Sequence, residues 1–194
     1  ARKSRGLGDV YKRQINILIN TILISSALYL FFITLRDFFS KKYKNFAQNT
    51  AHFGFSLLIL SILFNNLFSS EIITNLKVGE TYDNSKTKIV FESINQKKEK
   101  NYKSIIANFN ITNSEGINNN LSPELRIYNQ PNITTSEADI KTTLMKDKFI
   151  VINLVQNQDY FNVRYQVKPF MLWIWLSVIM ISLGGLISFL QKRI

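Results

Sequence analysis

The chain has 194 residues with 46% hydrophobic content and a formal net charge of +11, and it contains one histidine and no cysteine. This composition excludes disulfides, thiol-based metal sites and a His-rich metal site built by this chain alone. Nucleic-acid binding favours a basic stripe interleaved with aromatic residues. Here the basic residues flank three apolar runs and are scattered through a polar block, so we predict no nucleic-acid partner.

Residues 1–14, ARKSRGLGDVYKRQ, differ in composition from the Asn/Ile/Lys-rich remainder. They are basic and contain glycine, and no small-residue cleavage site follows the next apolar run, as it would in a signal peptide. We predict that they form an artefactual or disordered extension, and we exclude them from functional reasoning.

Three apolar runs are long enough to cross a bilayer as helices. Residues 15–35 form the first predicted span, and residues 36–49 a short loop with four basic residues and one acidic residue. Short basic loops stay in the cytoplasm, so residues 50–70 run outward as the second span. The third span, 169–190, returns to a basic tail at 191–194. The sequence thus predicts a multi-pass membrane protein.

The polar block at residues 71–168 is predicted to be an extracytoplasmic β domain inserted between the second and third spans. Several runs rich in Val, Ile, Phe and Tyr alternate apolar with polar residues and are separated by turn-like stretches. A block of this size favours a small antiparallel barrel or sandwich. One helical segment is expected at 136–145, capped by Ser136. The predicted strands are 88–93, 102–112, 124–129, 149–156 and 161–167.

His52 is the sole histidine and lies within the second span, about one turn from its cytoplasmic end. An ionisable group inside a membrane segment is costly and by default marks a functional site with a partner. The alternative is an interfacial imidazole that is partly solvated and has no role. Gly54 leaves room either for a flat macrocycle or for a neighbouring helix.

From Asn49 onward the chain resembles the C-terminal part of the CcmF family, the haem-handling membrane subunits of bacterial cytochrome c maturation. Each matching piece is short, but the pieces follow the family's order with similar spacing. They are Ala51, His52 and Gly54 of an AHxG-type motif; Leu76, Lys77, Gly79 and Glu80; Asn101 and Tyr102; Leu121, Pro123, Glu124, Arg126 and Tyr128; residues 134–140; Asp147; Arg164 with the KPF-x-x-WIW run at 168–175; and Gly184 with Gly185.

The resemblance implies that the chain is the C-terminal, three-span end of a larger haem lyase subunit in the bacterial cytoplasmic (inner) membrane, with residues 71–168 on the periplasmic side. His52 matches the family's membrane haem ligand. The family's tryptophan-rich segment and its other histidines have no counterpart here. We therefore expect haem b as the cofactor, held at the iron by His52 and by a second axial ligand from outside this chain.

The resemblance also implies partners, namely the membrane, a haem chaperone and the apocytochrome-presenting subunits of the maturation system. Haem attachment to cytochrome c is the family's activity, and we expect no catalysis from this fragment alone. The sequence also leaves open a membrane-anchored extracytoplasmic adaptor or scaffold without a cofactor. Arg126, Arg164 and Lys168 are expected to be ordinary solvated or salt-bridged residues rather than partners of haem propionates.

Overall fold

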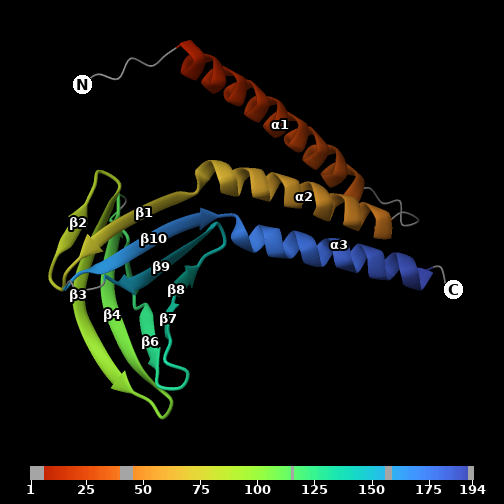
Figure 1. Ribbon diagram of the computed structural model, residues 1–194. Helices are drawn as coiled ribbons and strands as arrows, with labels where there is room; N and C mark the ends of the chain where they lie inside the picture. The colour runs from red at the N-terminus through yellow and green to blue at the C-terminus, as the bar shows by residue number, and fades with distance from the viewer. Residues whose placement is uncertain (1–6, 40–45, 115, 156–158, 192–194) are drawn as a thin grey trace. The chain divides into compact units, whose positions relative to one another are not determined.

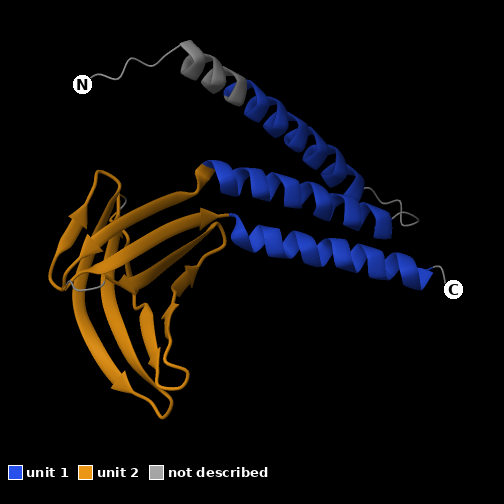
Figure 2. Ribbon diagram, in the orientation of Figure 1, with its two compact units in different colours: residues 1–67, 170–194 blue, residues 68–169 orange. Residues whose placement is uncertain are grey.

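The computed structural model of the protein describes residues 7–39, 46–114, 116–155 and 159–191. It separates into two compact units, which Figure 2 shows in different colours. Unit 1 contains residues 1–67 and 170–194, and unit 2 contains residues 68–169. The two units correspond to the helical and β parts that the sequence predicts.

Unit 1 contains three long helices, α1 (Leu7–Phe39), α2 (Phe46–Phe68) and α3 (Met171–Gln191) (Figure 1). Their apolar stretches of 23, 23 and 21 residues are long enough to cross a membrane. At a rise of about 1.5 Å per residue each reaches the ~30 Å of a hydrocarbon core. Many of their large apolar side chains are exposed, as expected of side chains that meet lipid.

Three helix boundaries lie well outside the predicted spans. Helix α1 already begins at Leu7, so the expectation of disorder is wrong for residues 7–14, whereas residues 1–6 lie outside the described residues. A helix nucleated by an apolar run extends into adjoining residues of adequate propensity, which hydropathy does not register. For the same reason α1 continues to Phe39 and α2 starts at Phe46. Both ends of the predicted 36–49 loop are thus helical, and residues 40–45 and 192–194 lie outside the described residues.

Unit 2 is a β-sandwich of two antiparallel sheets. One sheet has the strand order β1-β10-β9-β8, and the other has the order β2-β3-β4-β6-β7, with β5 paired to β4. The strands are β1 (Ser70–Leu76), β2 (Thr81–Asp83), β3 (Thr87–Lys98), β4 (Tyr102–Asn113), β5 (Asn118–Leu121), β6 (Glu124–Tyr128), β7 (Thr134–Glu137), β8 (Asp139–Thr142), β9 (Lys146–Leu154) and β10 (Phe161–Pro169).

The sandwich core lies between the inward faces of the two sheets. Alternation along β4 buries Ala107, Phe109 and Ile111, as the period-2 pattern predicts. The Phe109 ring stacks on Phe91 with ring centroids 4.4 Å apart, and Phe161 from the other sheet meets Phe91 edge-on at 5.6 Å. The predicted fold class, three membrane-length helices with an inserted antiparallel β domain, is confirmed, and the described strands form a sandwich.

The helix expected at 136–145 is wrong, because these residues form most of β7 and β8. Ser136 pairs with Leu125 in one sheet, and Ile140 pairs with Phe149 in the other. The Ser136 hydroxyl donates to the Asn153 side-chain oxygen instead of capping a helix. Short polar strands of this kind depend on pairing with distant partners, so local propensity does not reveal them.

Candidate functional site

Helix α2 carries the predicted site residue, His52, in its second turn. Its neighbours at helical spacing fall into three groups, one facing α1, one facing α3 and one facing neither. The face that each residue occupies follows from the contacts of the two neighbouring helices with α2. These contacts determine what surrounds the imidazole.

Helix α1 covers one face of α2 with aromatic and polar contacts. The Phe53 ring packs against Phe31 and Phe38 of α1, with centroids 5.5 and 5.2 Å away. The hydroxyls of Thr34 and Ser56 are 2.6 Å apart and share a buried hydrogen bond.

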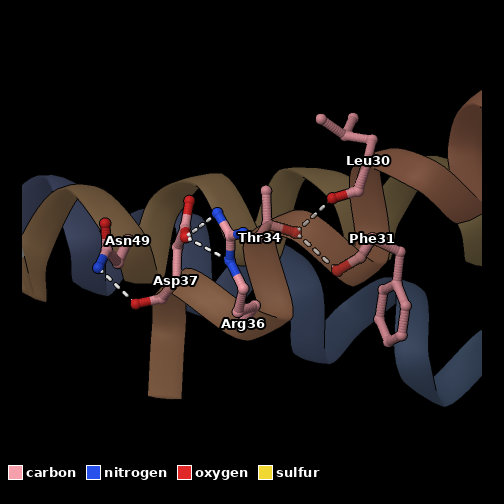
Figure 3. A network of polar contacts seen from close by, with 6 residues as sticks. All are labelled: Leu30, Phe31, Thr34, Arg36, Asp37 and Asn49. Carbon is pink, nitrogen blue, oxygen red and sulfur yellow. Dashed lines mark hydrogen bonds and ion pairs between the residues drawn. The ribbon is translucent and has the colours of Figure 1, made fainter. Parts of the chain in front are cut away.

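Figure 3 shows the polar end of this contact. The Asn49 amide donates to the Asp37 backbone carbonyl over 2.7 Å, and Arg36 pairs with the Asp37 carboxylate at 3.1 Å. The Thr34 hydroxyl donates to the carbonyls of Leu30 and Phe31 in its own helix. Of these bonds, the one from Asn49 joins α2 to α1, and together with the Thr34–Ser56 bond it constrains the rotation of α2 about its axis relative to α1.

Helix α3 covers a second face of α2 through very close backbone contacts. A Cβ atom built on Gly184 would lie 2.7 Å from the Ala51 backbone nitrogen and 2.8 Å from the Ala47 carbonyl oxygen. A Cβ on Gly54 would lie 3.0 Å from the Ser177 carbonyl oxygen. Small residues at helix crossings allow this approach in membranes. The room at Gly54 is therefore taken by a neighbouring helix, one of the two options that the sequence left open.

The third face of α2 is covered by neither helix, and His52 lies on it. Gln48, His52, Phe55 and Ile62 share this face at spacings of three, four and seven residues, and all four are exposed. The exposed fractions of Phe55 and Ile62 are 53% and 49%. Within the part of the chain that the structure describes, the imidazole makes no hydrogen bond or ion pair. It therefore points away from both α1 and α3.

The His52 imidazole on this face could ligate a haem iron. An imidazole nitrogen is the commonest protein ligand of haem iron, and apolar side chains such as Phe55 and Ile62 suit a porphyrin face. His52 is the only histidine of the chain, so any second imidazole must come from elsewhere. His52 would hold the iron, and the open face around it would bury the macrocycle.

The PExR-like motif forms a separate polar cluster in the β-sandwich. Arg126 pairs with Glu124 at 3.1 Å and with Glu137 at 3.7 Å, and its guanidinium lies 5.3 Å from the centre of the Tyr102 ring. Hydrogen bonding from Arg126 holds the pKa of Glu124 below its ordinary value of 4.5. The same pairing raises the pKa of Arg126. The cluster joins β4, β6 and β7 and is structural.

The lowered pKa of Glu124 predicts an acid-dependent loss of stability. The paired carboxylate stabilises the folded state above the ordinary pKa, and this contribution disappears as the pH falls through the lower folded-state value. We expect Glu124→Gln to lower the free energy of unfolding by about 1 kcal/mol at neutral pH. This value is small because the ion pair is partly solvated. The difference from wild type should shrink as the pH falls below the ordinary carboxyl value of 4.5, when the unfolding of the sandwich in urea is followed by hydrogen exchange of the β4 and β6 amides. A difference that stays constant as the pH falls would contradict the assignment.

Arg164 and Lys168, the other basic residues singled out in the sequence, are engaged within the sandwich. Arg164 and Gln166 both donate to the Glu71 carboxylate across the β1–β10 pair, and these two bonds lower the pKa of Glu71. The Lys168 ammonium lies 5.4 Å from the centre of the Phe149 ring. As expected from the sequence, these residues make ordinary structural contacts. The sequence revealed neither the exposure of His52 nor the close contact of Gly54 with α3.

A family profile described as "CcmF C-terminal beta-sandwich" matches residues 67–169. The "Cytochrome c-type biogenesis protein CcmF" of Escherichia coli (strain K12) is 27% identical over 143 residues, which are 74% of this chain and 22% of that protein. The "Cytochrome c-type biogenesis protein NrfE" of Haemophilus influenzae is 23% identical and covers 89% of this chain and 27% of its own length. The chain thus spans about a quarter of the length of these relatives.

A solved structure named "Cytochrome c Heme Lyase CcmF" has a similar fold. It superimposes with a TM-score of 0.63 at 17% identity, and the match covers 95% of this chain and 35% of that one. At this identity the likeness concerns the fold, and it includes both the helices and the sandwich.

Proposed function

The chain belongs to the CcmF family and corresponds to the C-terminal part of its members. On this basis we propose that it is the haem-binding end of an integral membrane subunit that delivers haem to apocytochrome c. His52 supplies one axial ligand to haem b, and the remainder of the protein supplies the other. The observation that carries the proposal is the orientation of His52, which lies on the one face of α2 that α1 and α3 leave open.

The energetics of that face support the proposal. An imidazole exposed at a membrane span without a hydrogen-bonding partner is unfavourable, and coordination to iron removes the penalty. Phe55 and Ile62, two exposed side chains of this face, are apolar, which favours a flat apolar ligand over water. Relatives of three to four times the length have ample chain with which to complete the pocket and provide the second ligand.

The orientation in the membrane is part of the same proposal. The basic stretch between α1 and α2 lies in the cytoplasm, so both the C-terminal end of α2 and the sandwich lie on the periplasmic side of the inner membrane. The sandwich faces the haem chaperone and the subunits that present apocytochrome c, whereas haem is bound by the helices. His52 is then near the cytoplasmic end of its span.

The proposal is tested by cytochrome c maturation in cells whose only copy of the complete gene carries His52→Ala. We expect the yield of holocytochrome c to fall by about tenfold or more, because the loss of supporting groups alone costs tenfold to a hundredfold at metal sites. Leu67→Ala, an exposed residue of α2 fifteen positions and about 22 Å further along the helix, is the matched control and should retain the wild-type yield. Equal yields for both variants would favour the scaffold without a cofactor.

A further inference from the structure

The turn between β8 and β9 presents two adjacent apolar side chains outward. Leu144 is 60% exposed and Met145 is 53% exposed. The turn beneath them is closed by Thr143, whose backbone N–H and hydroxyl both donate to the Lys146 carbonyl, over 3.0 and 2.6 Å. The Lys146 N–H donates back to the Thr143 hydroxyl over 3.2 Å. The exposure of the two side chains thus belongs to an ordered turn.

Other described turns of the sandwich are more polar at their tips. The β2–β3 turn carries Asn84, Ser85 and Lys86. The β3–β4 turn carries Glu99, Lys100 and Asn101. Elsewhere in the described turns exposed apolar residues occur singly, as at Val78. Two adjacent large apolar residues at a turn are costly in water unless something covers them.

Strand register places this turn at the end of the sheet where the chain leaves the sandwich for α3. Lys146 pairs with Pro169, the last residue of β10, and α3 begins at Met171. Figure 1 shows the β8–β9 turn beside the end of β10. Paired strands are about 5 Å apart, so the tip lies within about 10 Å of the point where the chain enters its third span.

The charges around the tip match a phospholipid surface. Residues 141–148 contain three lysines and one aspartate. Lys168 is the strand partner of that aspartate, Asp147, so a further lysine stands beside it in the sheet. Lys141 is exposed, and Lys146 is half-buried directly beside the apolar pair. Lysines next to apolar residues at a bilayer attract anionic headgroups while the apolar side chains enter the interface.

We propose that the β8–β9 turn inserts Leu144 and Met145 into the interfacial region of the bilayer that α2 and α3 cross, with Lys141 and Lys146 at anionic headgroups. The sandwich then has a third attachment to the membrane besides its two covalent connections. This inference depends on the helices crossing a bilayer and not on haem binding, so the two proposals fail independently.

The test uses the chain's lack of cysteine, which makes single-cysteine labelling specific. Met145→Cys in the full chain is labelled with the fluorophore NBD and reconstituted into nanodiscs of phosphatidylcholine and phosphatidylglycerol. Val78→Cys is the matched control, since Val78 is 49% exposed and follows β1 at the opposite end of the same sheet. The length of β1 separates the two sites by about 20 Å.

We expect a spin-labelled lipid with its doxyl group near the headgroup to quench NBD at position 145 about threefold more than at position 78, as befits a shallow interfacial residue. Aqueous iodide should show the reverse order. Equal lipid quenching at the two positions would overturn the proposal. So would protection of position 145 from both quenchers, which would indicate that another protein surface covers the turn.

The lysines are tested separately by adding Lys141→Glu and Lys146→Glu to the Met145→Cys chain. Lipid quenching at position 145 should fall in discs that contain phosphatidylglycerol and change little in discs of phosphatidylcholine alone. An equal change in both kinds of disc would overturn the role of headgroup charge.

Discussion

His52→Gly in the complete, detergent-purified protein is expected to lose haem and to regain it when imidazole is added. Glycine removes the ring and leaves space on the open face of α2 into which free imidazole can diffuse and coordinate the iron. Haem content should fall about tenfold or more, because the removal of a direct ligand exceeds the effect of losing its supporting groups. The reduced absorption spectrum of any residual haem should change, since the number of axial ligands has changed.

The control for this experiment is Phe55→Ala, which enlarges the same face without removing a ligand. Its haem should keep the wild-type spectrum even if less is bound, and imidazole should have no effect. A His52→Gly protein with unchanged haem content and spectrum would refute the ligand assignment and leave His52 as an interfacial residue.

Gly184→Leu is expected to separate α2 from α3, whereas Gly185→Leu should be tolerated. A Cβ on Gly184 already meets backbone atoms of α2 at 2.7 to 2.8 Å, which cannot yield as a flexible side chain would. Around Gly185 nothing lies within 4 Å of the added Cβ. Overpacking of this kind costs about 1–3 kcal/mol, and the bulk of a leucine places this variant at the upper end.

The two glycine variants differ by one position and carry the same new side chain, so membrane insertion and helix propensity are matched. Unfolding in mixed micelles of increasing denaturing-detergent content should give a lower midpoint for Gly184→Leu alone. Haem content should fall with it, because α3 determines which face of α2 stays open around His52. Equal midpoints would show that the close helix contact is not formed in the protein.

Local signals in the sequence were sufficient for the helices and for much of the sandwich. Charge-free apolar runs indicate spans, and the alternation in 102–112 matches the buried face of β4. The sequence could not distinguish a barrel from a sandwich, because that difference depends on which distant strands pair. Strands β7 and β8 were missed for the same reason, and a possible serine cap at Ser136 was misleading without a helix to cap.

The candidate site was predictable in identity but not in orientation. A sole histidine within a charge-free span indicated His52 directly. Whether it faced a neighbouring helix or the outside depended on Gly54 and Gly184, whose contacts arise between helices more than a hundred residues apart in sequence. The open face is therefore a property of helix packing, which no stretch of α2 specifies alone.

The pairing of β1 with β10 has a consequence for the assembly of the helices. The sandwich is inserted between α2 and α3, and its first and last strands are neighbours, with Ser70 opposite Val167. Folding of the sandwich therefore reduces a connection of about 100 residues to the equivalent of a tight turn. The loop-closure entropy removed in this way corresponds to about 3 kcal/mol in favour of the α2–α3 pair. The folded β-sandwich thereby lowers the entropic cost of packing α3 against α2, the helix that carries His52.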